Sequence, residues 1–567
     1  MAVNLASPGV LVREVDLTIG NVDPTSGSIG ALVAPFTKGP VEEPQLIENE
    51  EDLLQTFGQP YSIDNHYEYW MVASSYLAYG GVMQVIRAND DGLKNATDDG
   101  SPELLIKSDT HYNQLGYDDN VITGTVVAAK TPGSYANGIR VSIIDGKADQ
   151  ILTVAGISTV GLGVTQSVAN RVVAGAGGTS LLDGYLKGIV TGIPETGKAE
   201  VKILSHVSAA GTVTSVDYQA NGVYCFKASE IITPSAAGSN VGTGSTQVVS
   251  TQVDWFEQQE VVLTTKDGNG NPIKLEWDSL ADAPGTSSYA QARGGRFDEV
   301  HVVVIDDKGT ITGNAGTILE KHLNLSKAKD AEYSVGSTSY WRKYLATNSQ
   351  YIYGGSGPTG IVTTGFDGAT ATAIGTLDSD NSWDQDADSA DKGFGVFGVF
   401  TASLTGGKNY GGKTDYITTG ALDPGIDDII SGLELFSNTE EVEVDFVMMG
   451  AAHHTKEKSQ AVAEKCIAVA EFRKDAVAFI SPYRQAFLND SSAGTVTVNN
   501  IDTMTENIVS YYAPISSSTY GVFDSGYKYM FDRFNNTFRY VPLNGDIAGT
   551  CARTDIEQFP WLSLIHI

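Results

Sequence analysis

The fold is decided by residues 442–480, which read VEVDFVMMGAAHHTKEKSQAVAEKCIAVAEFRKDAVAFI. The apolar run Val442–Met449 predicts a buried strand, and Ala476–Ile480 predicts a second strand. Between them, Thr455 can cap the N-terminus of a helix. The apolar stripe of that helix consists of Val462, Cys466, Val469 and Ala470. A strand, a helix and a strand at this spacing predict a βαβ crossover with a parallel strand pair.

The N-terminal part of the chain shows the same α/β pattern. Residues 28–36 predict a buried strand, and residues 51–57 predict a short helix that ends at Gly58. Residues 65–79 place apolar side chains on one face of a helix, and a strand at Val82–Ile86 follows directly. A helix followed closely by a strand is typical of an α/β unit.

Residues 96–298 have a different character. Short β-like runs alternate with turns rich in glycine, serine, threonine, asparagine and aspartate, and no long amphipathic helix is present. The runs are Val121–Ala129, Ile139–Ile144, Ile151–Val154, Val201–His206, Val213–Tyr218 and Val261–Thr265. We therefore expect one or two inserted all-β domains, built as barrels or sandwiches.

The remaining segments complete the predicted layout. The apolar strand at residues 299–306 restarts the α/β pattern, and residues 315–328 predict a short helix. Residues 426–436 predict a helix or a strand, and residues 508–515 predict a strand. Residues 520–540 then predict a hairpin, whose turn lies at Asn535 and Asn536.

Taken together, these elements predict an α+β multidomain protein with a βαβ-containing α/β core and inserted all-β domains of barrel or sandwich type. The predicted domains are an N-terminal extended arm at 1–22, a discontinuous α/β core at 23–95 and 299–515, an outer β-rich insertion at 96–298, and the start of an incomplete C-terminal domain at 516–561.

Composition excludes several classes of function. A formal net charge of −32 repels nucleic-acid phosphate, so we expect no direct nucleic-acid binding. The three cysteines, Cys225, Cys466 and Cys551, are far apart and odd in number, which argues against a disulfide framework or a thiolate zinc site. Because no apolar run approaches the roughly 20 residues of a membrane span, we expect no membrane insertion.

One segment matches the phosphate-binding pattern G-x-x-x-x-G-K-S/T. It runs from Gly407 to Thr414, and a working nucleotide site would need a helix directly after Lys413 and Thr414. The continuation DYITTGALDPG is broken by Gly420 and Pro424, so a P-loop nucleotide-binding protein is retained only as an alternative from a different functional class.

Other candidate sites lack the partners that their chemistry requires. The acidic loop at 384–391 begins like a calcium loop, but Ser389 and Gly395 stand where an EF-hand needs glycine and glutamate. His453 and His454 are adjacent, and no third ligand lies at metal-binding spacing. We therefore expect no enzyme activity, no metal and no cofactor, and leave open whether the acidic loop binds a cation.

Several motifs, in this order, resemble the tail sheath family of contractile phages, in its T-even-like branch. They are SPGVLVREVD (Ser7–Asp16), YLAYGGVMQVIRA (Tyr76–Ala88), PGSYANGIRVSIID (Pro132–Asp145), the segment Glu299–Ala331, and YVPLNGDIAGTCARTD (Tyr540–Asp555). The resemblance implies a structural virion subunit that polymerises helically around the tail tube and contracts to drive the tube through the host envelope. The alternative within this class is the sheath of a non-phage contractile injection system.

The resemblance also implies partners and a site. The partners would be further copies of the chain, the tail tube protein, and baseplate and tail terminator proteins, with assembly in the host cytoplasm. Family members exchange terminal strands between subunits. In this sequence, the extended segment after Pro8-Gly9 has no hairpin partner nearby, so Val10, Leu11, Val12 and Val15 are the residues expected to carry the exchange.

The C-terminus departs from the family pattern, in which the chain continues well beyond the Arg-Thr-Asp stretch. Residues 562–567, LSLIHI, are also the translation of a transposase end sequence used in sequencing adapters. We therefore interpret them as an artefact and leave them out of the fold prediction. On this interpretation, residues 516–561 expose apolar surface that a complete protein covers, and the chain alone lacks one half of the strand exchange.

Overall fold

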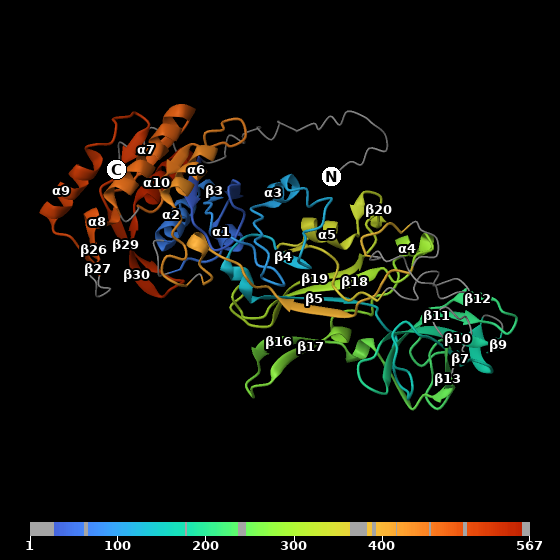
Figure 1. Ribbon diagram of the computed structural model, residues 1–567. Helices are drawn as coiled ribbons and strands as arrows, with labels where there is room; N and C mark the ends of the chain where they lie inside the picture. The colour runs from blue at the N-terminus through green and yellow to red at the C-terminus, as the bar shows by residue number, and fades with distance from the viewer. Residues whose placement is uncertain are drawn as a thin grey trace. The chain divides into compact units, whose positions relative to one another are not determined.

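The computed structural model describes residues 28–61, 66–175, 178–235, 245–362, 383–387, 393–415, 417–452, 455–490 and 496–557. The described residues form two compact units. Unit 1 comprises Asp118–Ala128 and Gly138–Leu404, and unit 2 comprises residues 28–117, Ala129–Asn137 and residues 405–557. Both units are drawn in Figure 1.

Unit 2 is built on a six-stranded sheet in the order β2-β3-β1-β24-β25-β28. Five strands run parallel, and only β2 at one edge is antiparallel to its neighbour. The strands are β1 (Ile29–Ala34), β2 (Gln45–Ile47), β3 (Val82–Arg87), β24 (Phe446–Met448), β25 (Val477–Ile480) and β28 (Gly521–Phe523).

Helices cover both faces of this sheet, because alternate strand residues point to opposite sides. Ala31 and Val33 join the core cluster that contains α6, α7 and α9, whereas Leu32 joins the cluster that contains α2 and α10. The helices of unit 2 are α1 (Glu50–Phe57), α2 (His66–Ala78), α3 (Asp109–Gln114), α6 (Ile426–Leu435), α7 (Lys456–Arg473), α8 (Arg484–Phe487), α9 (Ile501–Tyr512) and α10 (Asn544–Glu557).

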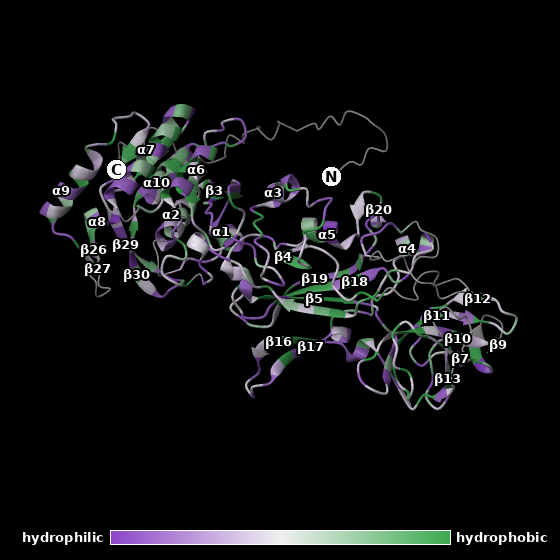
Figure 2. Ribbon diagram, viewed as in Figure 1, coloured by the Kyte–Doolittle hydropathy of each residue, from purple (hydrophilic) through white to green (hydrophobic). Residues whose placement is uncertain are grey.

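The βαβ crossover predicted from residues 442–480 is confirmed. Strands β24 and β25 are parallel neighbours, with Val447 opposite Ala478, and α7 connects them. The Thr455 side chain accepts a hydrogen bond from the Lys458 backbone N–H and caps the helix as predicted. The apolar stripe of α7 is buried. Figure 2 shows that α6 and α7 carry both hydrophobic and hydrophilic residues.

The other predictions for unit 2 have mixed outcomes. The helix at 65–79 and the strands at 28–36 and 82–86 are confirmed, as is the hairpin, whose strands are β29 (Tyr527–Asp532) and β30 (Thr537–Pro542). The strand predicted at 508–515 is wrong, because these residues lie mostly in α9. Asn500 caps α9 by accepting a hydrogen bond from the Thr503 N–H, and this local start signal outweighs the β-branched and aromatic run that follows.

Unit 1 contains an eight-stranded sheet in the order β14-β13-β7-β10-β11-β6-β15, with β12 paired to β11. Its core includes Leu152, Val164, Leu186, Val201 and Phe226. The strands are β6 (Gln150–Thr153), β7 (Gly163–Ser167), β10 (Tyr185–Gly192), β11 (Lys198–Val207), β12 (Val213–Ser215), β13 (Ile231–Ser235), β14 (Gln247–Val248) and β15 (Thr251–Asp254). This sheet, at residues 150–254, is called the inserted β module below.

A second sheet of unit 1 is antiparallel and has the order β19-β18-β5-β23. Its strands are β5 (Ile139–Asp145), β18 (Glu299–Asp306), β19 (Thr317–Ser326) and β23 (Val399–Ser403). The hairpin of β16 (Glu260–Lys266) and β17 (Pro272–Glu276) shares a core cluster with it. The smaller elements of unit 1 include β8 (Arg171–Gly175), β9 (Gly178–Leu182), α4 (Ser288–Ala292), β20 (Glu332–Ser334), β21 (Ser337–Thr338), α5 (Trp341–Asn348) and β22 (Ile352–Gly354).

This second sheet corrects two predictions. The strand at 299–306 exists, but it is paired with antiparallel β5 and β19 and does not restart the α/β pattern. The short helix predicted at 315–328 is wrong, because β18 supplies hydrogen-bond partners along β19. Residues 299–404, which were expected in the α/β core, therefore lie in unit 1 with the β-rich segments.

Candidate assembly surface

Strand β28 lies at the end of the six-stranded sheet. It pairs with β25 on one side, with Phe479 opposite Val522, and in the described part of the chain no strand pairs with its other side. An open edge presents backbone N–H and C=O groups that can accept a strand from another chain. This edge is therefore a candidate site for strand addition.

The edge strand is held firmly from α9 and from the neighbouring strand. The Tyr512 hydroxyl donates to the Asp524 carbonyl at 2.8 Å and lies 3.2 Å from the Ile480 carbonyl. Its ring packs on Phe523, with 4.7 Å between the ring centroids. Because β28 is fixed before any partner arrives, little conformational freedom would be lost when a strand is added.

A buried polar network lies at the carboxyl ends of β24, β25 and β28. The Ser481 hydroxyl donates to the Asp524 carboxylate at 2.5 Å, and the Asn544 amide donates to Ser481 Oγ at 2.9 Å and to the Gly450 carbonyl at 2.9 Å. Asn544 is the first residue of α10. The network therefore attaches α10 to three strands of the sheet.

Burial, and to a smaller extent the nearby Asp546, raises the pKa of Asp524 to about 7, although hydrogen bonds from Ser481 and the Gly526 N–H oppose the shift. Because the folded pKa lies above the unfolded value, this carboxyl's contribution to stability is complete below about pH 4 and is lost as pH rises to 7. Buried His66 acts in the opposite direction: its pKa of about 3 means that its contribution is lost as pH falls below the unfolded value.

We expect Asp524→Asn to remove one part of this pH dependence. The variant should have a stability close to that of the wild type at pH 4 and should become progressively more stable than the wild type up to pH 8. The difference in unfolding free energy between the variant and the wild type is measured at each pH by urea unfolding, with hydrogen exchange in β28 and α10 as the readout. Because His66 is present in both proteins, its contribution cancels in this difference. Asp415→Asn, at an exposed position, is the matched control. A difference between D524N and wild type that does not change with pH would contradict the assignment.

The hairpin β29–β30 exposes a row of aromatic rings. Tyr529, Phe531 and Phe538 are 61%, 46% and 58% exposed, and half-buried Tyr540 extends the row. Tyr529 lies opposite Tyr540 and Phe531 opposite Phe538, with ring centroids 4.7 and 5.1 Å apart. Exposed apolar clusters of this kind mark interaction sites. We call these four residues the aromatic face.

The opposite side of the hairpin is anchored to the core of unit 2. Lys528 donates to Ser75 Oγ and to the Asp546 carboxylate, both at 2.7 Å. Arg539 pairs with Asp532 at 2.9 Å and lies 4.3 Å from the centre of the Tyr67 ring. The aromatic face is therefore presented on a fixed support.

Helix α10, which contains residues 544–555 of the motif Tyr540–Asp555, packs closely on α2, far away in the sequence (Figure 1). A Cβ atom built at Gly545 would lie 2.4 Å from the Val72 carbonyl oxygen, and one built at Gly549 would lie 2.6 Å from the Tyr79 ring. Only glycine allows this approach of the two helices at these positions. The glycines of the motif therefore have a packing role.

The residues predicted for strand exchange, Val10, Leu11, Val12 and Val15, lie outside the described residues. The sequence analysis missed the aromatic face as a candidate interface. The available signal was the alternation of aromatic residues at 529, 531, 538 and 540 in a predicted hairpin, because side chains two apart on a strand share one face.

The phosphate-loop pattern at Gly407–Thr414 does not have the required geometry. No helix follows Lys413 in residues 413–425, of which all but 416 are described. The Asn409 side-chain oxygen Oδ1 accepts a hydrogen bond from the Ser134 N–H at 2.9 Å, and the Tyr410 hydroxyl donates to the Ala88 backbone carbonyl at 2.9 Å. This segment joins the motif at Pro132–Asp145 to the end of β3, and its role in the structure is packing.

Other candidate residues also have structural contacts. Asp384 accepts hydrogen bonds from the Tyr340 hydroxyl and from Trp341 Nε1, and Asp386 lies 3.5 Å from Lys329 Nζ. Asp388, like His453 and His454, lies outside the described residues. Among the residues that the structure covers, no group of three His, Cys, Asp or Glu side chains could hold a metal ion.

Cys225, Cys466 and Cys551 are buried and are not joined in disulfides, and burial raises the pKa of Cys466 to about 12. A high thiol pKa disfavours the reactive thiolate at neutral pH. A search of the described helices found none that is both long enough and apolar enough to span a bilayer.

Comparison with known proteins shows which proteins this chain is similar to. The chain is 24% identical over 596 residues to the tail sheath protein of Enterobacteria phage T4, covering 99% of the chain and 74% of that protein. It is 24% identical over 575 residues to the tail sheath protein of Vibrio phage KVP40, covering 99% and 75%. It is 21% identical over 563 residues to that of Salmonella phage ViI, covering 97% and 70%. These matches place the chain among the homologues of contractile-phage tail sheath proteins, which are structural virion components.

The three matched relatives are tail sheath proteins of T4-like phages, which agrees with the resemblance that the sequence motifs indicated. No family model matches the chain. Among solved structures, a sheath tail protein from Listeria innocua is 10% identical and covers 91% of this chain and 68% of its own, with a TM-score of 0.26.

Proposed function

We propose that the chain is a structural subunit of a contractile tail sheath, which polymerises helically around a tail tube and contracts to drive the tube through the host envelope. The observation that carries this proposal is the alignment of three tail sheath proteins over 97–99% of the chain. The partners are further copies of the chain, the tube protein, and the baseplate and terminator proteins. The sheath of a non-phage injection system is the alternative within the same class.

In this proposal, the arm at residues 1–22 adds as a strand to the open edge of β28 in a neighbouring subunit. Val10, Leu11, Val12 and Val15 lie on the added strand. The open edge and its fixed geometry support this choice of acceptor. Main-chain hydrogen bonds would keep neighbouring subunits connected while the subunits rotate as rigid bodies. Contraction would release energy that is stored in a kinetically trapped lattice, and it would need no nucleotide hydrolysis.

Strand addition is tested with a labelled peptide of residues 1–22 and a chain that lacks these residues. We expect the peptide to bind, as measured by fluorescence anisotropy, and to slow hydrogen exchange in β28. A peptide with proline at positions 10 and 12 should bind at least tenfold more weakly, because proline has no N–H to donate. Threonine at both positions is the control that keeps the N–H groups. Failure of the unmodified peptide to bind, or protection confined to other strands, would contradict the proposed acceptor.

The competing nucleotide-binding function is tested by calorimetry with ATP and Mg²⁺. We expect no binding heat for the wild-type chain or for Lys413→Ala, since no helix begins directly after Lys413 in the described residues 413–415 and 417–425. Tight binding that depends on Lys413 would overturn the structural assignment.

A further inference from the structure

The inserted β module is joined to the four-stranded sheet of unit 1 by two chain connections that run side by side. The chain leaves β5 at Asp145 and enters the module at Gln150, and it returns at Asp254, which lies opposite Gln150 in the paired strands β6 and β15. The Trp255 N–H donates to the Asp149 carbonyl at 3.1 Å. Two adjacent connections of this kind form a single tether, about which a module can bend.

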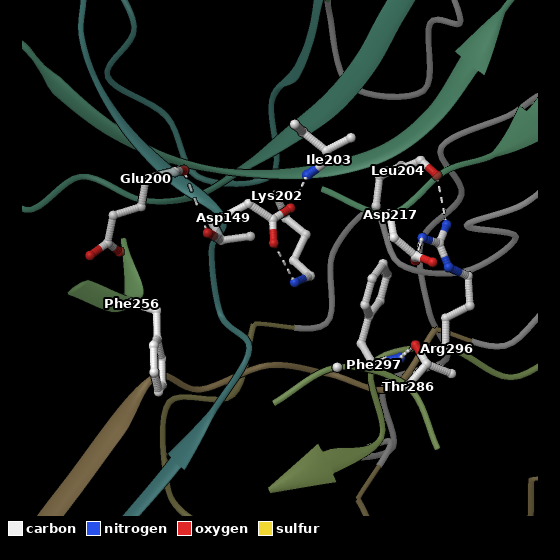
Figure 3. A network of polar contacts seen from close by, with 12 residues as sticks. Asp149, Glu200, Lys202, Ile203, Leu204, Asp217, Phe256, Thr286, Arg296 and Phe297 are labelled. Carbon is white, nitrogen blue, oxygen red and sulfur yellow. Dashed lines mark hydrogen bonds and ion pairs between the residues drawn. The ribbon is translucent and has the colours of Figure 1, made fainter. Parts of the chain in front are cut away.

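A third contact, remote from the tether in sequence, limits this bending. Arg296 precedes β18, and its guanidinium donates to the Leu204 carbonyl at 2.6 Å and to the Val216 carbonyl at 3.0 Å (Figure 3). It also lies 3.4 Å from the Asp217 carboxylate. Arg296 is 6% exposed, so these bonds are shielded from water. Hydrogen bonds from a charged group are stronger in such a buried environment than in water.

Phe297 lies between two cations at this contact. Its ring centre is 4.7 Å from Lys202 Nζ of the module and 4.5 Å from the Arg296 guanidinium carbon. The ring also packs with Ile189 and Leu204 of the module. Two cations near one ring, with apolar contacts beside them, hold the ring in place within the module.

The backbone of Phe297 connects the ring to the four-stranded sheet. Its carbonyl accepts a hydrogen bond from Lys327 Nζ at 3.0 Å, and Lys327 pairs with Asp145, the last residue of β5, at 2.8 Å. Its N–H donates to Thr286 Oγ1 at 3.0 Å. Phe297 has a φ of 65°, which is unfavourable for a residue with a side chain and is maintained here by contacts on both sides.

Lys202 closes the network on the side of the tether. Its Nζ lies 2.9 Å from the Asp149 carboxylate, which also accepts the Ile203 N–H at 2.7 Å. In the same region, Glu200 pairs with Lys147 at 2.9 Å and accepts a hydrogen bond from Trp255 Nε1 at 3.0 Å. The tether and the third contact are therefore linked through β11 (Figure 3).

We infer that Arg296, Phe297 and Lys202 form an orientation lock, which fixes the angle of the inserted β module relative to the four-stranded sheet. Without the lock, the module would remain folded on its own core and would swing about the tether. With the lock, unit 1 moves as one body. This inference rests on contacts within unit 1 and is independent of the proposed sheath function.

The lock is tested by distance measurements between spin labels introduced by Val248→Cys on β14 and Lys321→Cys on β19, both exposed positions. We expect a single narrow distance distribution in the otherwise wild-type protein. Arg296→Met should broaden that distribution at least twofold and increase the rate of proteolysis at residues 146–149 about tenfold. Hydrogen exchange in β7 and β10 should stay at the wild-type level, which shows that the module itself is folded.

Two further variants make the result decisive. Phe297→Gly removes the ring and at the same time relieves the strain at φ 65°, and it should also broaden the distribution. Because the ring is buried, the same hydrogen-exchange measurement in β7 and β10 checks that the module of this variant is still folded. Arg293→Met is the control, because Arg293 lies 3.5 Å from the Tyr289 ring centre at an exposed site outside the lock. A distribution that is broad in the wild type, or one that stays narrow in both R296M and F297G, would overturn the inference.

Discussion

Replacing Lys327 by methionine is expected to destabilise unit 1 by about 3–5 kcal/mol, because the substitution leaves the buried Asp145 carboxylate without its cation. Lys327 and Asp145 are both almost completely buried. The lysine also donates to the carbonyls of Phe297 and Gly395, which would lose these hydrogen bonds. Urea unfolding followed by tryptophan fluorescence reports on unit 1, which contains four of the six tryptophans.

The matched control is Lys329→Met, two residues further along the chain. Lys329 is about half exposed, and its pair with Asp386 is 3.5 Å long, so we expect a change of no more than about 1 kcal/mol. The double variant Asp145→Asn/Lys327→Met should be more stable than Lys327→Met alone, since it no longer buries an uncompensated charge. Equal destabilisation by K327M and K329M would show that the buried pair contributes little.

Gly545→Ala is expected to destabilise unit 2 by about 3 kcal/mol, at the upper end of the range for overpacking a close contact. The added methyl group would lie 2.4 Å from the Val72 carbonyl oxygen, which is backbone and cannot move independently of α2. Helix α10 would have to shift away from α2, and the Asn544 hydrogen bonds to Ser481 and Gly450 would weaken with it. Hydrogen exchange in α2 and α10 measures the loss directly.

Gly268→Ala serves as the control for this substitution. A Cβ at Gly268 meets no atom within 4 Å, and the residue is not among those with positive φ. The unfolding free energy of the Gly268→Ala variant should therefore differ from that of the wild type by less than about 0.5 kcal/mol. If G545A and G268A unfold at the same denaturant concentration, the glycine of the motif is not required for the packing of α10 on α2.

The sequence predicted the segments in which local pattern and tertiary environment agree. Residues 442–480 show a cap, a helical stripe and two apolar strands, and the structure has all of these. The hairpin turn at Asn535 and Asn536 is another example, and Asn536 adopts the positive φ that such turns use. The predicted arm at 1–22 and the predicted terminal segment 562–567 lie outside the described residues and stay predictions.

One element and the pairing of another were predicted wrongly because their decisive partners are not local. The segment TILEKHLNLS at 317–326 has charges and leucines that favour a helix, yet it forms β19 because β18 lies beside it. Likewise, β18 itself was assigned to an α/β pattern, although its neighbours β5 and β19 are antiparallel. Sequence spacing alone gives no information about which strand becomes the neighbour.

By itself, the sequence determined where β1, β3, β24, β25, α2 and α7 of the α/β unit lie and to which class of protein the chain is related. Periodicity, caps and turn residues are local signals that act within a few positions, and they therefore predict single helices and strands. The resemblance to a class of proteins comes from the order of several motifs along the whole chain. Only the tertiary structure decided that β28 has an edge without a paired strand among the described residues, that the hairpin β29–β30 is anchored through Lys528 to Ser75, and that Lys202 lies beside the Phe297 ring. These features depend on contacts between residues far apart in the chain, and a one-dimensional pattern does not specify such contacts.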